Sequence, residues 1–323
     1  MRIRSYDFGQ ETEIISLWNR CLAKDPINLE VFERKVLLDP NFEAGGLLLA
    51  EDKGGLLGFS YNIVREYPFL RDEVEEDKDR GWIVAFGLVP EARHGEVGDS
   101  LIQASLEYHK RKGKKAVLYS PYVPNYFFPG IDADSYPNEY DALMRNGFKE
   151  AKGAEGLAMD ANLWPDFERP SDIVEREERL RRDGIAIEVL TTEYLYPLMK
   201  FLKEHLHGDW YRHARELLLH NRKEQLIIAV KGREVVGYCQ FWDGEGYEWY
   251  MPASHFGPFG VREDMRGKGI GTVLLHRCLE VMKENGIHNA FLLWTGEEAR
   301  SLYERFGFKV TRVFRIMKRN LET

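Results

Sequence analysis

Apolar runs separated by glycine-containing turns occur twice along the chain. Residues 47–50 and 56–59 are mainly apolar and flank the turn at residues 52–55, which predicts a strand, a tight turn and a second strand. Residues 226–238 repeat this pattern of apolar run, turn and apolar run. The hydrophobic pattern therefore indicates a β-hairpin in each half of the chain.

The similarity between the halves continues in a constant register. Equivalent positions lie 173 residues apart: Arg93 and Arg266, Gly98 and Gly271, Gly113 and Gly286. A constant offset over a strand, a loop and a long helix indicates two copies of one domain. We expect the copies to span residues 1–168 and 169–323, with a charged linker helix at residues 169–184.

The order of the predicted elements favours an α+β fold. In each copy, helices come first, followed by the hairpin, a further strand, a long amphipathic helix, another strand, a short helix and final strands. Such an order predicts a central mixed sheet flanked by helices.

Charge and cysteine content narrow the classes of function. The 323 residues carry a formal net charge of −8, which argues against binding to nucleic acid or to anionic lipid. The cysteines at positions 21, 239 and 278 are odd in number and far apart, so they indicate neither a disulfide framework nor a thiolate zinc site. Acidic residues near the N-terminus argue against a signal peptide, and the expected location is the cytoplasm.

The histidine cluster at positions 205, 207 and 213 does not favour a metal site. Residues two apart do not share a helical face, and neither a cysteine nor a compact carboxylate set completes the cluster. We expect these side chains to line the mouth of a substrate site or to face solvent. No metal is expected.

A glycine-rich loop in the second copy has the features of a phosphate site. Gly267, Gly269 and Gly271 remove Cβ atoms from a turn that leads into a helix, so backbone N–H groups can converge on an anion. Arg266 and Lys268 add positive charge, and the helix N-terminus adds its dipole. The alternative is an ordinary turn with solvated basic side chains. The loop has neither the Walker A ending nor the Rossmann spacing.

Two segments of the second copy together resemble a known family. The spacing Arg266-x-x-Gly269-x-Gly271 after an apolar strand resembles the acyl-coenzyme A signature of the GNAT N-acetyltransferases. Tyr303 lies four residues before a Gly-Phe pair, which is similar to the tyrosine helix of that family. The resemblance covers most of residues 185–323, and it implies that the whole chain is a tandem pair of GNAT domains.

The resemblance also implies where acetyl-coenzyme A binds. The family sheet splays open beside the motif strand, and the backbone amides of residues 259–261 would bind the pantetheine arm and the acyl carbonyl there. The implied coenzyme-binding residues are Phe259, Gly260, Val261, Arg266, Gly267, Lys268, Gly269, Ile270, Gly271 and Thr272.

The resemblance assigns Tyr303 as the acid that protonates the departing thiolate. Its ordinary pKa near 10 lies above that of a thiol, so it stays protonated at neutral pH. Glu248 and His255 are the candidate bases, because both can lie near the opening of the sheet. Residues 241–250 bring aromatic and acidic side chains close to the motif strand, which would suit a cationic amine. The alternative for Tyr303 is a tyrosine that only packs in the core. The alternative for residues 241–250 is an acidic turn that faces solvent.

The first copy departs from the family pattern. Glu96 replaces the middle glycine of the loop, Asp99 adds a second negative charge, and Leu143 stands where the tyrosine should be. These changes predict a copy that has lost catalysis. An aromatic, proline-rich segment at residues 120–132 is extra in this copy, and it is either a lid over an acceptor or a loop packed between the domains.

The sequence therefore predicts an acyl-coenzyme A dependent N-acyltransferase. It would transfer acetyl from acetyl-coenzyme A to a small primary amine, with a cation favoured, by direct attack in the second copy. Two other functions stay open: a non-catalytic acyl-coenzyme A binding or sensing protein, and a protein lysine acetyltransferase.

Overall fold

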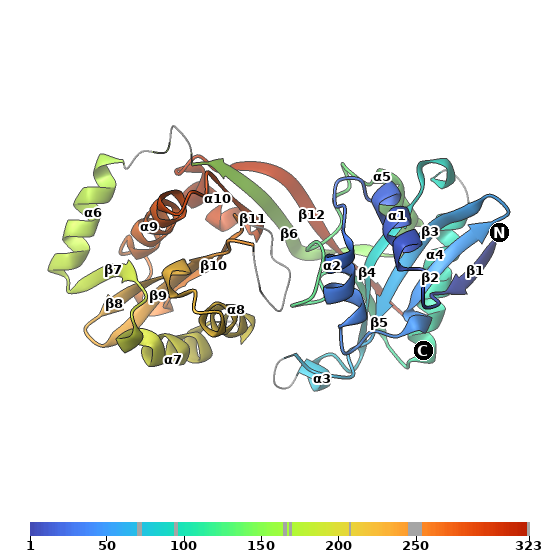
Figure 1. Ribbon diagram of the computed structural model, residues 1–323, viewed down its shortest axis with the longest axis horizontal. Coiled ribbons are helices and arrows are strands. Elements are labelled where there is room, and N and C mark those ends of the chain that lie inside the picture. Colours follow the sequence, from blue (N-terminus) through green and yellow to red (C-terminus); the bar gives the residue numbers. More distant parts are fainter. Residues whose placement is uncertain are drawn as a thin grey trace. The chain divides into compact units, whose positions relative to one another are not determined.

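A computed structural model describes residues 1–69, 73–93, 96–163, 167, 170–206, 208–244 and 254–321. The chain forms two compact units (Figure 1). Unit 1 comprises Met1–Gly156 and Arg312–Thr323, and unit 2 comprises Leu157–Thr311. The division expected between residues 168 and 169 comes from the order of the repeat along the chain. The two units, by contrast, group the residues that contact one another in space.

Unit 1 is built on a mixed sheet. Its strands are, in spatial order, β1 (Arg2–Ser5), β2 (Leu47–Asp52), β3 (Gly55–Ile63), β4 (Arg80–Leu88), β5 (Ala116–Tyr119) and the end of β12 (Lys309–Asn320). Neighbouring strands are antiparallel except for β4 and β5, which are parallel. Its helices include α1 (Glu11–Cys21), α2 (Leu29–Phe32), α3 (Glu73–Glu76), α4 (Val97–Arg111) and α5 (Pro137–Arg145).

Unit 2 repeats this arrangement. The antiparallel strands are β7 (Ile185–Val189), β8 (Leu226–Lys231), β9 (Glu234–Phe241) and β10 (Phe256–Val261). A further strand, β11 (Asn289–Thr295), pairs with the second half of β6 (Lys149–Asn162). Its helices include α6 (Ser171–Arg182), α7 (Leu195–His205), α8 (Gly208–Leu219), α9 (Ile270–Glu284) and α10 (Glu297–Glu304).

The two units exchange their last strands. In chain order, β6 follows the elements of the first copy, yet its residues from Leu157 to Asn162 pair with β11 of unit 2. The chain returns through β12, in which Met317 pairs with Tyr119 of β5 in unit 1. The side chain of Arg312 is anchored in unit 1, where it donates to Asp25 at 2.6 Å and to Asp132 at 2.7 Å. Because a repeat in sequence reports only chain order, it cannot reveal such an exchange.

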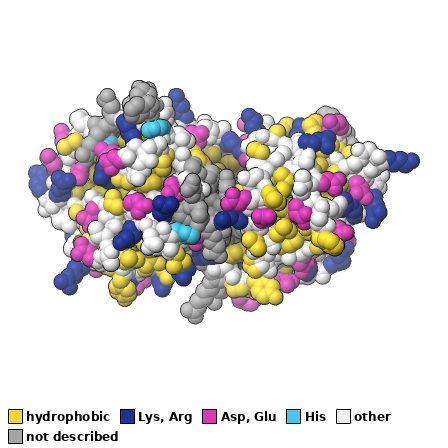
Figure 2. All heavy atoms as spheres, viewed as in Figure 1, with side chains coloured by type: hydrophobic (Ala, Val, Ile, Leu, Met, Phe, Trp, Pro, Cys, Tyr) yellow, Lys and Arg dark blue, Asp and Glu magenta, His cyan; other side chains and the backbone are white. Residues whose placement is uncertain are grey.

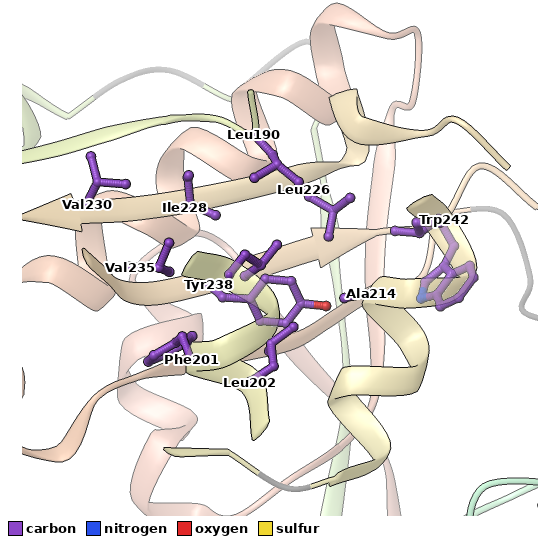
Figure 3. Packing of buried hydrophobic residues seen from close by; sticks show 12 residues of the cluster. Leu190, Phe201, Leu202, Ala214, Leu226, Ile228, Val230, Val235, Tyr238 and Trp242 are labelled. Carbon is purple, nitrogen blue, oxygen red and sulfur yellow. The ribbon is translucent and has the colours of Figure 1, made fainter. Parts of the chain in front are cut away.

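The core of unit 2 lies on both faces of the β7–β10 sheet. Tyr238 of β9 and Trp242, which directly follows β9, face α7 and α8, and in Figure 3 they lie with Leu226, Phe201 and Ala214 in one buried cluster. The other face is covered by α9 (Figure 1). On this face, Val236 and Val261 pack with Ile270 and Val273 of α9 and with Leu180 of α6. The helix expected to be a linker is therefore a packed part of unit 2.

The surface mixes charges of both signs. On the face drawn in Figure 2, Lys and Arg side chains alternate with Asp and Glu side chains over both units. Within the described residues, every helix is too short or too polar to cross a membrane.

Candidate functional site

The sheet of unit 2 opens between β10 and β11. His255 and Phe291 form an isolated parallel bridge at the start of β10, and their rings are 5.3 Å apart. Beyond this bridge, β10 and β11 belong to different sheets. Trp82 and Leu118 pair in the same parallel way 173 positions earlier in unit 1, so the register of the repeat is the same at this point.

The backbone of β10 directs two amides into this opening. The N–H of Arg262 donates to Val236 of β9 at 2.9 Å, and antiparallel hydrogen bonding alternates along a strand. Gly260, which pairs with Tyr238, therefore directs its N–H toward β9, whereas Phe259 and Val261 direct theirs away from it. Of residues 259–261, Phe259 and Val261 thus have amides directed away from β9, and the amide of Gly260 is used within the sheet.

Gly260 has a different part in the site. A Cβ atom at this position would lie 2.7 Å from the ring of Trp210 and 3.2 Å from Leu206. The glycine therefore allows the start of α8 to approach β10 closely. Sequence reasoning missed Trp210 and Leu206, because only a known position in space connects them to the motif strand.

Tyr303 lies beside the opening, between β10 and the end of β11. Its ring centroid is 6.1 Å from that of Phe256 and 6.4 Å from that of Phe259, and its side chain is 7% exposed. Burial raises the pKa of the phenol above its usual value, and a side-chain hydrogen bond with Thr295 offsets part of this rise. The hydroxyl therefore remains a proton donor at neutral pH. Thr295 could not be identified from the sequence, because it belongs to no recognisable motif.

The glycine-rich loop adopts the backbone that its glycines permit. Gly267 has φ +78°, and Gly269, the residue before α9, has φ +86°. Residues with a side chain rarely adopt such angles, so this turn depends on glycine. The helix starts at Ile270, directly after Gly269. Its first N–H groups lie at the loop, as an anion site requires.

The remaining predicted coenzyme residues surround this turn. Nε of Arg266 donates to the carbonyl of Val261 at 3.2 Å, and Nζ of Lys268 lies 3.4 Å from Sδ of Met265. A Cβ atom on Gly271 would lie 3.3 Å from the ring of Phe259. Ile270 is buried and Thr272 is half-buried. The loop and the opening of the sheet are thus adjoining parts of one site.

Of the two candidate bases, His255 is among the described residues and Glu248 is not. His255 is 9% exposed and lies at the bridge where β10 and β11 meet. Glu248 lies outside the described residues, as does Glu245. Asp243, from the same acidic segment, accepts a hydrogen bond from Gln225 at 2.7 Å and lies 3.7 Å from Arg222.

The histidine cluster is dispersed. His205 is exposed at the end of α7, whereas His213 of α8 lies 3.3 Å from Asp209 and packs against Trp242. His207 lies outside the described residues. In the part of the chain that the structure describes, no group of His, Cys, Asp and Glu side chains is arranged to hold a metal ion.

The corresponding site in unit 1 has a different backbone and is filled. Glu96, which corresponds to Gly269, has φ −75°, so the left-handed turn is lost. Oε1 of Glu139 accepts a hydrogen bond at 3.2 Å from the N–H of Leu88, which corresponds to Val261. Arg93 donates to the carbonyl of Cys21 at 3.2 Å, and its Nε lies 3.8 Å from Glu139. The side chains of unit 1 thus occupy groups that are open in unit 2.

The aromatic, proline-rich segment of unit 1 is part of its interior. Tyr122 and Asn125 are buried, and the ring of Phe127 lies 4.6 Å from that of Trp18 on α1. Asn125 donates to Asp39 at 2.7 Å. The segment therefore packs within unit 1.

Comparisons with known proteins find a family model that matches part of unit 2. Residues 192–308 match the model of the acetyltransferase (GNAT) family. An L-methionine sulfoximine/L-methionine sulfone acetyltransferase of Pseudomonas paraeruginosa is 30% identical over 88 residues, which are 27% of this chain and 51% of that protein. The chain thus spans about half the length of the curated relatives that it matches.

Solved structures share the fold over the whole chain. One is the GNAT-type glucosamine N-acetyltransferase region of a fungal multi-domain beta-N-acetylglucosaminidase, with TM-score 0.75 and 17% identity over 98% of this chain and 38% of that one. Another is a tandem GNAT protein from the clavulanic acid biosynthesis pathway, with TM-score 0.62 and 12% identity over 100% of this chain and 99% of that one.

Proposed function

Because this chain has the tandem GNAT fold and residues 192–308 match the model of the acetyltransferase (GNAT) family, we propose that unit 2 transfers acetyl from acetyl-coenzyme A to a primary amine. The opening between β10 and β11 carries this proposal. The N–H groups of Phe259 and Val261 that are directed away from β9, the glycine loop and the Tyr303 hydroxyl support it together. A non-catalytic binding module would need the loop but not the protonated phenol.

The donor fits the groups that line this opening. The N–H groups of Phe259 and Val261 would hydrogen-bond to the pantetheine arm and to the carbonyl oxygen of the thioester. The loop amides before Ile270, with Arg266 and Lys268, would bind the diphosphate.

The chemical step is a direct acyl transfer. The lone pair of a neutral amine attacks the thioester carbon, the C–N bond forms, and the C–S bond breaks as the electron pair leaves on sulfur. Tyr303 is the proton donor to that thiolate, because its buried phenol has a raised pKa and is therefore protonated at neutral pH when the thiolate forms. The proton of the resulting ammonium passes to a base, for which His255 and Glu248 are the candidates, directly or through water. The phenol is then reprotonated from solvent.

We propose a small molecule as the acceptor. The names of the proteins similar to this chain denote acetyltransferases of methionine derivatives and of glucosamine, which supports a small amine over a lysine of a protein. Acidic side chains before β10 favour a cationic amine over an acidic one.

The test is a screen of primary amines with the full chain, acetyl-coenzyme A and free thiol as the readout. Amine-dependent thiol release that is lost in Arg266→Ala is the expected result. Tight donor binding without turnover on a polyamine, an aminoglycoside, amino sugars, amino acids or a lysine peptide would favour the binding or sensing module. Failure to bind acetyl-coenzyme A would overturn the proposal.

A further inference from the structure

Helix α6 places an arginine at the glycine loop of unit 2. A Cβ atom on Gly269 would lie 3.5 Å from Nη1 of Arg176, which is in the middle of α6. Nothing in the family signature includes this helix, because it precedes the first strand of the copy. Its position is fixed by packing: Leu180 of α6 is buried in the same cluster as Val261, Met265 and Ile270, which flank the loop.

Arg176 belongs to a charge cluster that also includes the tyrosine helix. Nε of Arg176 donates to Oδ2 of Asp172 at 3.1 Å, and the guanidinium of Arg305 pairs with the same carboxylate oxygen. Arg305 directly follows α10, which carries Tyr303. Asp172 therefore connects α6 to the helix that carries the proposed acid, next to the loop.

Among the described residues of this cluster, the positive charge exceeds the negative charge by one. Two guanidinium groups share the single carboxylate of Asp172, whereas nearby Arg262 is paired with both Asp264 and Glu234. The side chains of Arg176 and Arg305 are 32% and 36% exposed, so a ligand can reach them. Asp172 engages Arg176 through Nε, and within the described part of the chain neither Nη group of Arg176 donates a hydrogen bond, so both can serve another partner; a guanidinium fork suits a phosphate.

We propose that Arg176, held by Asp172, binds a phosphate of the acyl donor and makes α6 the third wall of the donor site, beside the glycine loop and α10. This inference rests on the proposed function. Acetyl-coenzyme A carries a diphosphate and a 3′-phosphate, and either group can meet a guanidinium at this position. Arg176 acts in donor binding, so its loss should lower the affinity for the acyl donor.

The experiment measures the dissociation constants of acetyl-coenzyme A and of acetyl-3′-dephospho-coenzyme A by calorimetry on the full chain. Arg176→Ala should weaken binding by about tenfold to a hundredfold, the size expected for a lost charge-assisted contact. Equal loss for both donors assigns Arg176 to the diphosphate, and loss for acetyl-coenzyme A alone assigns it to the 3′-phosphate. Arg176→Lys should fall between Arg176→Ala and the parent, because it keeps the charge but not the fork.

The matched control is Arg181→Ala on the same helix. Arg181 pairs with Glu177 and its side chain is 65% exposed, so this variant should bind both donors as the parent does. The inference is overturned if Arg176→Ala binds both donors within about twofold of the parent while Arg266→Ala binds them more weakly. A parent that binds neither donor would instead contradict the proposed function. Circular dichroism and the thermal midpoint of each variant verify that the fold is retained.

Discussion

Glu139 accepts a hydrogen bond from the backbone N–H of Leu88 at 3.2 Å, at the position of unit 1 that corresponds to Val261 of unit 2. In unit 2, the amide at this position points into the opening of the sheet. In unit 1, one of the protein's own carboxylates therefore takes the amide that would bind the donor in the site proposed for unit 2, and Arg93 contacts Cys21 and Glu139. This contact gives a structural reason for a first copy without a donor site.

Replacing Glu139 with glutamine should stabilise the protein at neutral pH. The carboxyl is 1% exposed, and burial raises its pKa above the ordinary value of 4.5. The native state thus binds this proton more tightly than the unfolded state does. The free energy of unfolding therefore falls as the pH rises from the ordinary carboxyl pKa of 4.5 to the higher pKa of the native state. Glutamine is neutral and its carbonyl can still accept from Leu88. The thermal midpoint of Glu139→Gln should exceed that of the parent at pH 7 and equal it at pH 4. A lower midpoint at pH 7 would show that the carboxylate stabilises unit 1.

Gly269→Ala should weaken donor binding by more than its effect on stability explains. The left-handed conformation at φ +86° costs a residue with a Cβ atom about 1–2 kcal/mol, and the loop relieves this strain by moving its amides away from the phosphate. Gly286→Ala is the matched control, because Gly286 has φ +77° at the other end of α9 and a Cβ atom would meet nothing there. Calorimetry with acetyl-coenzyme A should separate the two variants. Equal affinities in both would reject the loop as the phosphate site.

Tyr303→Phe should keep the affinity for acetyl-coenzyme A and lower turnover by about a hundredfold or more, since only the proton donor is lost. Tyr196→Phe is the control, because Tyr196 is 78% exposed on α7. The raised pKa of Tyr303 also predicts that turnover of the parent does not decline between pH 8 and 10, where an ordinary phenol would begin to ionise. An unaltered rate in Tyr303→Phe, with chemistry as the slow step, would remove this residue from the mechanism.

The sequence was sufficient for the parts of the fold and site that depend on local chemistry. Gly267 and Gly269 predicted a tight turn before a helix, which the structure forms with positive φ at both residues, and the constant offset from Arg93 to Arg266 predicted two copies with one register. These features follow from a few neighbouring residues, so one sequence contains them. Tyr303 was placed by its distance from a Gly-Phe pair.

Long-range packing accounts for what the sequence did not reveal. The exchange of β6 and β12 depends on which neighbouring strand each of them pairs with. The residues of a strand are the same whether it pairs in its own copy or in the other copy, so the sequence does not show which pairing forms. Trp210 contacts Gly260, and Thr295 bonds to Tyr303, across distances in the chain that no spacing rule covers. The role of α6 was missed for the same reason, because its charged surface indicated a linker while Leu180 packs in the core of unit 2.

The most direct test of the account is the number of acetyl-coenzyme A molecules that one chain binds. Unit 2 has the left-handed glycine turn and the open amides, whereas in unit 1 Glu96 removes the turn and Glu139 occupies the amide of Leu88. Calorimetric titration of the full chain should therefore give one tight site, which Arg266→Ala abolishes and Arg93→Ala leaves intact. Two tight sites per chain, or a site in Arg266→Ala that disappears on adding Arg93→Ala, would contradict the account.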